Sequence, residues 1–176
     1  MTAAVLMTTL AACSNQQITN EATPPEVVQQ TVAENNAITD ASNSASLPSF
    51  TVQDVNGNGV NLNSFKGKKV FVNLWASWCP PCRAEMPSIE KLYQSVDSSK
   101  VAFVMLALDN DFEQSKQFIK KQGLNLPVYY PTENLPQLFN VQGIPATFIF
   151  NEQGELIQRI DGGDDYDTDR YRELLK

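Results

Sequence analysis

A run of almost uninterrupted apolar residues at 69–75 most constrains the fold of this chain, because only a strand covered on both faces tolerates such a run. A second run of this kind spans residues 101–108. Between and after them, apolar stripes predict helices over 80–96 and over 111–122, the latter ended by Gly123. Buried strands that alternate with helices indicate a mixed central sheet with helices on both faces.

Shorter elements complete this pattern, and turn residues such as those at 56–59 separate them. In chain order they are a strand at 50–55 with a return strand at 60–62, a short strand at 127–130, a helical segment at 135–140, a hairpin of strands 147–150 and 156–160, and a closing helix at 165–175. The expected order is β-β-β-α-β-α-β-α-β-β-α, which is an α/β fold.

The first 49 residues differ in composition from the rest of the chain. They contain no Lys, no Arg and no aromatic residue, and their charged residues are all acidic. Residues 14–46 are rich in Ser, Asn, Gln, Thr and Ala, with too few apolar residues to build a core. This composition predicts a disordered tether over 14–46 and a folded domain over 47–176.

Residues 1–13 are small and apolar, as at the end of the hydrophobic region of a secretory signal peptide. The segment Leu10-Ala-Ala-Cys13 resembles the bacterial lipobox, in which the Cys is lipidated and becomes the new N-terminus. The resemblance implies a lipid anchor at Cys13. The signal is partial, since no basic residue precedes Cys13, and the alternative is an ordinary apolar start with a chance Cys.

Charge and residue content exclude several functions. The chain carries 13 basic and 20 acidic residues, for a net charge of −7, which argues against nucleic-acid binding. It has no His, and therefore no Ser-His or Cys-His catalytic pair and no imidazole metal site. No apolar run reaches the roughly 18 residues that a membrane-spanning helix requires.

The candidate catalytic residues are Cys79 and Cys82, which follow a buried strand and begin a helix. Their spacing is about one helical turn, so both sulfurs can meet on one side of the first turn. Unpaired N–H groups there stabilise a thiolate and lower the pKa of Cys79. Pro80 and Pro81 fit, because first-turn N–H groups lack intrahelical acceptors. The pattern predicts thiol–disulfide exchange, in which Cys79 attacks a substrate disulfide and Cys82 resolves the mixed disulfide.

Two other interpretations of the Cys pair are weaker. A structural zinc site needs two more Cys or His ligands, and only Cys13 remains. An inert structural disulfide does not explain a reactive position at a strand-to-helix turn. We therefore expect no metal, and no cofactor beyond the redox-active disulfide Cys79–Cys82.

Residues 71–87, Phe-Val-Asn-Leu-Trp-Ala-Ser-Trp-Cys-Pro-Pro-Cys-Arg-Ala-Glu-Met-Pro, resemble the active-site segment of TlpA/ResA-type thiol-disulfide oxidoreductases, within the redoxin (AhpC/TSA-like) superfamily. Residues 141–148 are similar to the loop of such proteins that carries a cis-proline opposite the CxxC. The resemblance implies a thioredoxin fold with an N-terminal β-hairpin and a central αβ insertion near residues 111–130. It also implies that Ile144 and Pro145 contact the substrate, pairing with it like an added strand.

Four neighbouring residues are expected to modulate the Cys pair. Pro80 and Pro81 separate the two Cys residues, and Trp78 is expected to lie exposed beside them. Glu85 matches a Glu that ResA-type proteins keep three residues after the second Cys, near enough to influence thiol protonation. The alternative is that Glu85 is a solvated residue on the helix surface. Asn73 replaces the buried acid of thioredoxins, so proton transfer by that route is absent.

The resemblance further implies a monomer that is lipid-anchored on the periplasmic side of the cell envelope and reduces disulfides there. Its implied partners are Cys-containing envelope proteins, such as apocytochrome c in cytochrome c biogenesis, and a membrane thiol transporter of the DsbD/CcdA type as electron donor. One alternative is a peroxiredoxin-like thiol peroxidase. Another is a non-catalytic partner-binding module, for example for copper delivery, although such delivery in similar folds relies on a His that this chain lacks.

Overall fold

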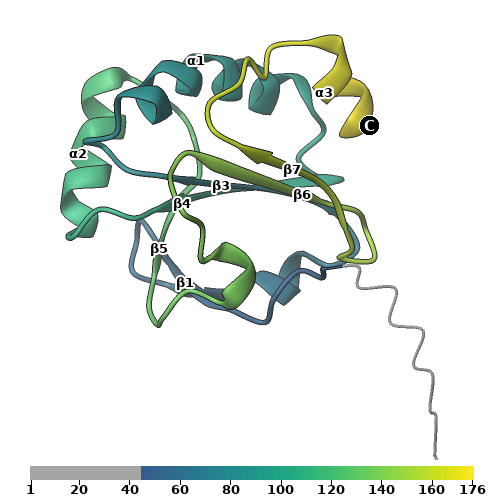
Figure 1. The fold of residues 1–176 in the computed structure, drawn as a ribbon, viewed down its shortest axis with the longest axis horizontal. Coiled ribbons are helices and arrows are strands. Elements are labelled where there is room, and N and C mark those ends of the chain that lie inside the picture. Colours follow the sequence, from purple (N-terminus) through teal and green to yellow (C-terminus); the bar gives the residue numbers. More distant parts are fainter. Residues whose placement is uncertain (1–44) are drawn as a thin grey trace, which may run out of the picture. The chain divides into compact units, whose positions relative to one another are not determined.

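A computed structural model describes residues 45–176 (Figure 1). The expected signal-like segment 1–13, the lipidation of Cys13 and nearly all of the expected tether 14–46 lie outside the described residues. The first described residues are already attached to the domain. The N–H of Leu156 donates to the carbonyl of Ala45 (2.8 Å), and the N–H of Leu47 donates to the carbonyl of Gly154 (2.7 Å).

The described chain contains all the strands and helices expected from the sequence, with small differences in their ends. The strands are β1 (Thr51–Asp54), β2 (Gly59–Asn61), β3 (Lys69–Trp75), β4 (Val101–Ala107), β5 (Val128–Pro131), β6 (Ala146–Phe150) and β7 (Leu156–Asp161). The helices are α1 (Pro80–Ser95), α2 (Phe112–Gln122) and α3 (Asp169–Leu174), with 3-10 turns η1 (Leu62–Phe65) and η2 (Gln137–Phe139). Only η1 had no counterpart among the expected elements.

The strands form one mixed sheet in the order β2-β1-β5-β4-β3-β6-β7. Strand β3 is central and pairs parallel with β4 and antiparallel with β6, which explains why its sequence is apolar on both faces. The N-terminal hairpin of β1 and β2 joins the sheet through an antiparallel pairing of β1 with β5. No local pattern in either strand indicates this last pairing, because it links residues that are far apart in the chain.

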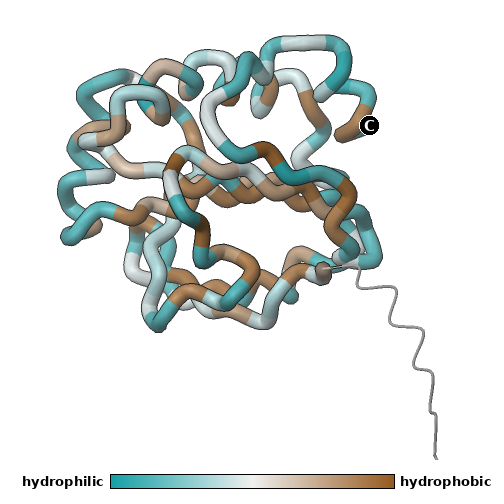
Figure 2. Tube along the Cα trace, in the orientation of Figure 1, coloured by the Kyte–Doolittle hydropathy of each residue, from teal (hydrophilic) through white to brown (hydrophobic). Residues whose placement is uncertain are grey.

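The two faces of the sheet are covered differently. Helices α1, α2 and α3 lie on one face, while η1, η2 and the segment at 47–50 cover the other (Figure 1). Each face has its own cluster of buried apolar side chains, and hydrophobic residues follow the central strands in Figure 2. The sequence predicted helices on both faces of the sheet. The structure has α-helices on one face only, and the other face is covered by the short 3-10 turns η1 and η2. Within residues 45–176, no helix is long and apolar enough to cross a membrane.

The end of the chain differs most from the sequence prediction. The closing helix was expected to begin near residue 165, but it begins at Asp169. In the preceding residues, Asp side chains accept hydrogen bonds from backbone N–H groups. The carboxylate of Asp164 accepts from the N–H of Asp165 (2.8 Å), and that of Asp165 accepts from the N–H of Asp167 (3.0 Å). Such local bonds compete with helix formation. Residues 162–168 therefore form a loop, called the C-terminal loop below.

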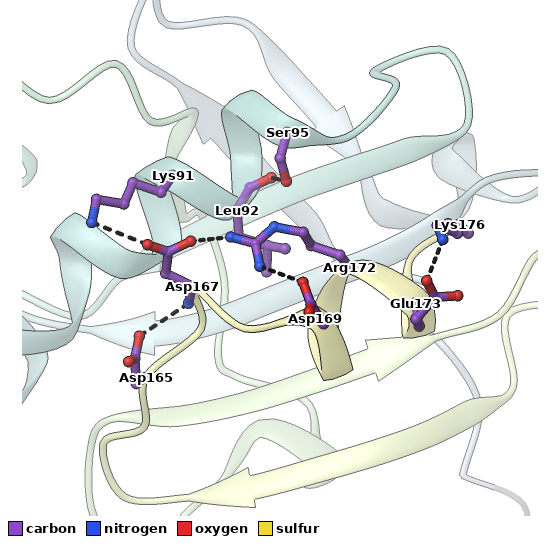
Figure 3. Close-up of polar contacts among 9 residues, drawn as sticks. All are labelled: Lys91, Leu92, Ser95, Asp165, Asp167, Asp169, Arg172, Glu173 and Lys176. Atoms are coloured by element: carbon purple, nitrogen blue, oxygen red, sulfur yellow. Dashed lines mark hydrogen bonds and ion pairs between the residues drawn. The ribbon is translucent and has the colours of Figure 1, made fainter.

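The C-terminal loop is attached to one stripe of α1, at residues spaced three apart. The three contacts run from the N–H of Asp164 to Oε2 of Glu85 (3.3 Å), from the N–H of Tyr166 to Oγ of Ser88 (3.0 Å), and from Nζ of Lys91 to Asp167 (3.0 Å). Figure 3 shows that Arg172 of α3 bonds the same Asp167 and also reaches Asp169. Exposed ion pairs of this kind contribute little stability singly, so their main effect here is to position the loop.

We predict that Phe71→Ala on β3 strongly destabilises the domain. The Phe71 ring is fully buried, stacks on Phe103 (centroids 4.6 Å apart) and meets the edge of Tyr166 (5.3 Å). Its removal should lower the free energy of unfolding by about 3–5 kcal/mol in urea denaturation of the oxidised protein. The control Ile157→Ala alters an exposed side chain on β7 and should change it by about 0.5 kcal/mol or less. Equal losses in the two variants would contradict this packing.

Candidate active site around the Cys79–Cys82 disulfide

Cys79 and Cys82 lie where β3 leads into α1, and the two residues form a disulfide with their Cα atoms 5.3 Å apart. Cys79 is the N-cap of α1, and its Sγ accepts the N–H of Cys82 (3.3 Å). Pro80 and Pro81 fill the first two helical positions, where a missing N–H costs no intrahelical bond. The expected meeting of both sulfurs in one helical turn is confirmed.

The two sulfurs differ in their access to solvent. Cys82 has no exposed surface, whereas Cys79 keeps 3% of its surface exposed. Trp78 lies immediately before it and is 62% exposed, as expected, while Trp75 is fully buried in the core. The small opening to solvent at the disulfide is therefore at Cys79 and not at Cys82.

The Ile144–Pro145 peptide bond is cis, as the resemblance implied. The carbonyl oxygen of Ile144 lies 3.7 Å from Sγ of Cys79, so residues 65 positions apart meet at the disulfide. Among the described residues, the backbone groups of Ile144 have no backbone hydrogen-bond partner. A hollow of about 400 Å³ continues from this loop to Asp161 and Gly162 at the end of β7. The loop thus presents backbone groups that lack backbone partners beside Sγ of Cys79.

Glu85 is buried, with only 4% of its surface exposed, so the alternative of a solvated surface residue is wrong. Its Oε1 accepts from Nδ2 of Asn73 (2.8 Å), and its Oε2 accepts from the N–H of Asp164 (3.3 Å). Burial raises the pKa of Glu85 to about 7, although both hydrogen bonds favour the ionised form. The carboxyl group can therefore gain or lose a proton near neutral pH.

Asn73 extends this contact into a buried chain of polar groups. Its Nδ2 also donates to Oγ1 of Thr147 (2.9 Å), which in turn shares a hydrogen bond with the hydroxyl of Tyr166 (2.7 Å). Burial, and secondarily the charge of Glu85, raises the pKa of Tyr166, which keeps that hydroxyl neutral. The sequence did not indicate roles for Thr147 and Tyr166. The only signal was a polar Asn73 within an apolar strand.

The Glu85 carboxylate faces a second hollow, of about 420 Å³, on the other side of Pro81. A methyl group placed on Gly163 would lie 3.6 Å from Oε2 of Glu85, 3.7 Å from the carbonyl oxygen of Pro81 and 3.9 Å from Cγ of Pro145. These three groups therefore surround the same space. The absence of a side chain at Gly163 leaves this space open next to Glu85.

Asp109 is a further buried residue of the site that the sequence analysis did not single out. It follows β4, and its carboxylate accepts from the N–H (3.1 Å) and Oγ (2.7 Å) of Ser77 and from Oγ of Ser115 (2.6 Å). Ser77 belongs to the loop before Cys79, and Ser115 belongs to the first half of α2. Asp109 thus fixes the loop that carries Trp78 and Cys79 to the neighbouring helix.

Comparison with known proteins adds three findings. A family model described as redoxin matches residues 41–175. The thiol-disulfide oxidoreductase ResA of Bacillus subtilis is 31% identical over 122 residues, which cover 69% of this chain and 68% of that protein.

Two solved structures are similar. A thioredoxin-family thiol:disulfide interchange protein of Chlorobium tepidum has a TM-score of 0.65, 31% identity and coverage of 75% of this chain and 96% of that chain. StoA of Bacillus subtilis has a TM-score of 0.62, 26% identity and coverage of 73% and 100%.

The raised pKa of Glu85 predicts a stability change with pH. An unfolded Glu loses its proton near pH 4.5, whereas the folded protein retains the Glu85 proton up to about pH 7. The folded state is therefore penalised progressively as the pH rises through this window. For Glu85→Gln, which carries no charge, the free energy of unfolding relative to wild type should rise by about 2.5 kcal/mol between pH 5 and pH 8.

Urea denaturation of the oxidised proteins at both pH values measures this difference. Glu113→Gln is the matched control, because its lowered pKa lies below the window and its variant should show no such trend. A pH-independent difference between Glu85→Gln and wild type would mean that Glu85 titrates as an ordinary carboxylate.

Proposed function

The chain belongs to the redoxin family, among its ResA-type thioredoxin-fold thiol-disulfide oxidoreductases, and from this premise we propose that it reduces disulfides in substrate proteins through Cys79 and Cys82. The names of its relatives favour thiol–disulfide exchange over a thiol peroxidase or a non-catalytic binding module. The observation that carries the proposal is the unequal access to the two sulfurs of a helix N-terminal disulfide, beside the open backbone of Ile144.

The exchange proceeds in two balanced steps. The Cys79 thiolate attacks one sulfur of the substrate disulfide, a mixed disulfide forms, and the other substrate sulfur leaves as a thiolate. The Cys82 thiolate then attacks Sγ of Cys79, which forms the Cys79–Cys82 disulfide and releases the second substrate thiolate. Two electrons pass to the substrate, and its two thiolates take up the protons that Cys79 and Cys82 released. The structure contains the oxidised end state of this exchange.

Substrate binding is assigned to the cis-proline loop. The N–H and C=O of Ile144, which have no backbone partner among the described residues, suit an extended peptide that pairs like an added strand. The position of Ile144 beside Sγ of Cys79 would hold the Cys of such a peptide in line for attack. Pro145 lines the hollow at this loop, and the exposed Trp78 directly precedes Cys79.

Glu85 is assigned a role in thiol protonation. An ionised carboxylate below the first turn of α1 opposes a second negative charge on the sulfurs, and a protonated one does not. Because the pKa of Glu85 is about 7, its charge changes within the pH range in which thiolates form at helix N-termini. The two hydrogen bonds from Asn73 and Asp164 keep the carboxyl group in place through this change.

The proposal extends to the location and partners that the sequence suggests. We place the protein on the periplasmic side of the cell envelope, anchored through a lipid on Cys13. Its substrates would be Cys-containing envelope proteins such as apocytochrome c, and a membrane thiol transporter would return electrons to the Cys79–Cys82 disulfide. This part is supported by the lipobox-like segment and by the family resemblance.

Substitution of the resolving Cys tests the two-step exchange. With Cys82→Ser the second step is blocked, so the mixed disulfide on Cys79 should accumulate. Mass spectrometry then identifies the substrate protein that is covalently bound to Cys79. Cys79→Ser, the matched control, should trap no partner, because the accessible nucleophile is missing. Trapping through Cys82 in the second variant would reverse the assigned roles, and trapping in neither would argue against exchange chemistry.

The pH dependence of thiol reactivity tests the role of Glu85. In the reduced protein, alkylation of Cys79 by iodoacetamide reports the thiolate fraction. Removal of the negative charge in Glu85→Gln should shift the midpoint of this titration to lower pH, by about one unit. The exposed Glu113→Gln should leave the midpoint unchanged. Identical pH profiles of alkylation for wild type and Glu85→Gln would show that Glu85 does not influence the protonation of Cys79.

A further inference from the structure

A groove between α1 and α2 begins beside the redox pair, on the side away from the C-terminal loop. Two adjoining hollows, of about 460 and 390 Å³, share Arg83, Phe118 and Gln122. Pro80 lies at one end of the first hollow, and Ser77 lies in the second, so the groove reaches both sides of Cys79 in the sequence. We call this feature the α1/α2 groove.

The charges that line the α1/α2 groove are all positive. Arg83 and Lys121 are its only charged residues, and within residues 45–176 neither of them forms an ion pair. The opposite flank of the disulfide is acidic, with Asp164 and Asp165 lining the hollow next to Glu85. The two flanks of the site therefore carry opposite charges.

The position of Arg83 has no explanation in the stability of α1. It lies in the first turn, directly after Cys82, where the helix dipole disfavours a cation. Lys121 differs in this respect, because a cation in the last turn of α2 is favoured. The guanidinium of Arg83 stacks over the ring of Phe118 (5.6 Å to the centroid), which orients it across the groove. Arg83 is exposed, and its N–H groups have no acceptor among the described residues, so they are accessible to a ligand.

We propose that the α1/α2 groove binds an acidic segment of the substrate protein, with a substrate carboxylate held by Arg83 and Lys121. A guanidinium with free donors in a fixed plane is suited to bidentate binding of a carboxylate. The exposed parts of Phe118, Pro87 and Leu124 offer apolar contact to the same segment. The inference rests on the proposed function, because it concerns the substrate whose disulfide reacts with Cys79.

The position of the groove argues for the substrate as its occupant. A peptide whose Cys is bonded to Cys79 and which pairs with Ile144 can continue past Pro80, which lines the groove. An extended chain advances about 3.3 Å per residue, so a few residues suffice to enter the groove. The substrates selected this way carry Asp or Glu a few residues from the reactive Cys, on one side of it only.

The test is a double-mutant cycle between protein and peptide. Each peptide contains one internal disulfide. The peptides are made in pairs that differ only by Glu or Gln at one position, and a separate pair is made for each position before and after the reactive Cys. The rate constant for peptide reduction is measured in single turnover with the reduced full chain. The variants are Arg83→Gln and Lys121→Gln, and the control is Lys120→Gln, whose exposed cation lies on α2 outside the groove.

At one position on one side of the Cys, wild type should reduce the Glu peptide about fivefold faster than the Gln peptide, as expected for a partly exposed charge pair. Arg83→Gln should bring this ratio close to one, Lys121→Gln should lower it, and Lys120→Gln should preserve it. The ratio should also fall at high ionic strength. The loss of the Arg83 charge also changes the reactivity of Cys79, but this affects both peptides equally and cancels in the ratio.

Three results would overturn the inference. One is a ratio near one at every position with wild type, and another is a ratio that survives Arg83→Gln. The third is a ratio near one with wild type that rises above one when Glu21, Glu26, Glu34 and Asp40 are replaced by their amides in the full chain, since the chain's own acidic segment would then be the occupant. Failure of wild type to reduce any peptide would instead refute the proposed function, on which the inference depends.

Discussion

The buried carboxylate of Glu85 requires hydrogen-bond donors, and it joins three separate parts of the fold through them. It lies under the first turns of α1 with no cation beside it among the described residues, so its oxygens need hydrogen-bond donors. Asn73 from β3 supplies one donor, and the backbone of Asp164 in the C-terminal loop supplies the other. The loop in turn is held along α1 through Ser88 and Lys91. The sheet, the active-site helix and the end of the chain are thus connected through one titratable group.

The redox pair depends on two further anchors that reach it from distant parts of the chain. Asp109, at the end of β4, fixes the loop before Cys79 through Ser77. The Ile144–Pro145 loop, which leads into β6, brings a carbonyl oxygen next to Sγ of Cys79. None of these groups is a His. In the proposed exchange, the helix N-terminus stabilises the thiolate, and Glu85 is the group that exchanges a proton near neutral pH.

Much of the fold could be predicted because strong local patterns coincide with the elements. The apolar run at 69–75 is β3, Gly123 in the left-handed conformation ends α2, and the turn at 56–59 joins β1 to β2. The beginning of α3 was predicted too early, because Asp164 and Asp165 hydrogen-bond neighbouring N–H groups instead of starting a helix. An amphipathic pattern does not reveal such competition, since it records only which residues are apolar.

The sequence by itself determined that Cys79 and Cys82 meet in the first turn of a helix after a buried strand, because both conditions follow from spacing and periodicity over fewer than twenty residues. It also identified Glu85 as a candidate, while leaving open whether that carboxylate is solvated. Only the tertiary structure decided this question. The burial of Glu85, its bond to Asn73, and the groove formed by Arg83 and Phe118 all require side chains from elements that local sequence does not place together. Desolvation and charge proximity, which set the chemistry of the site, are properties of that packing.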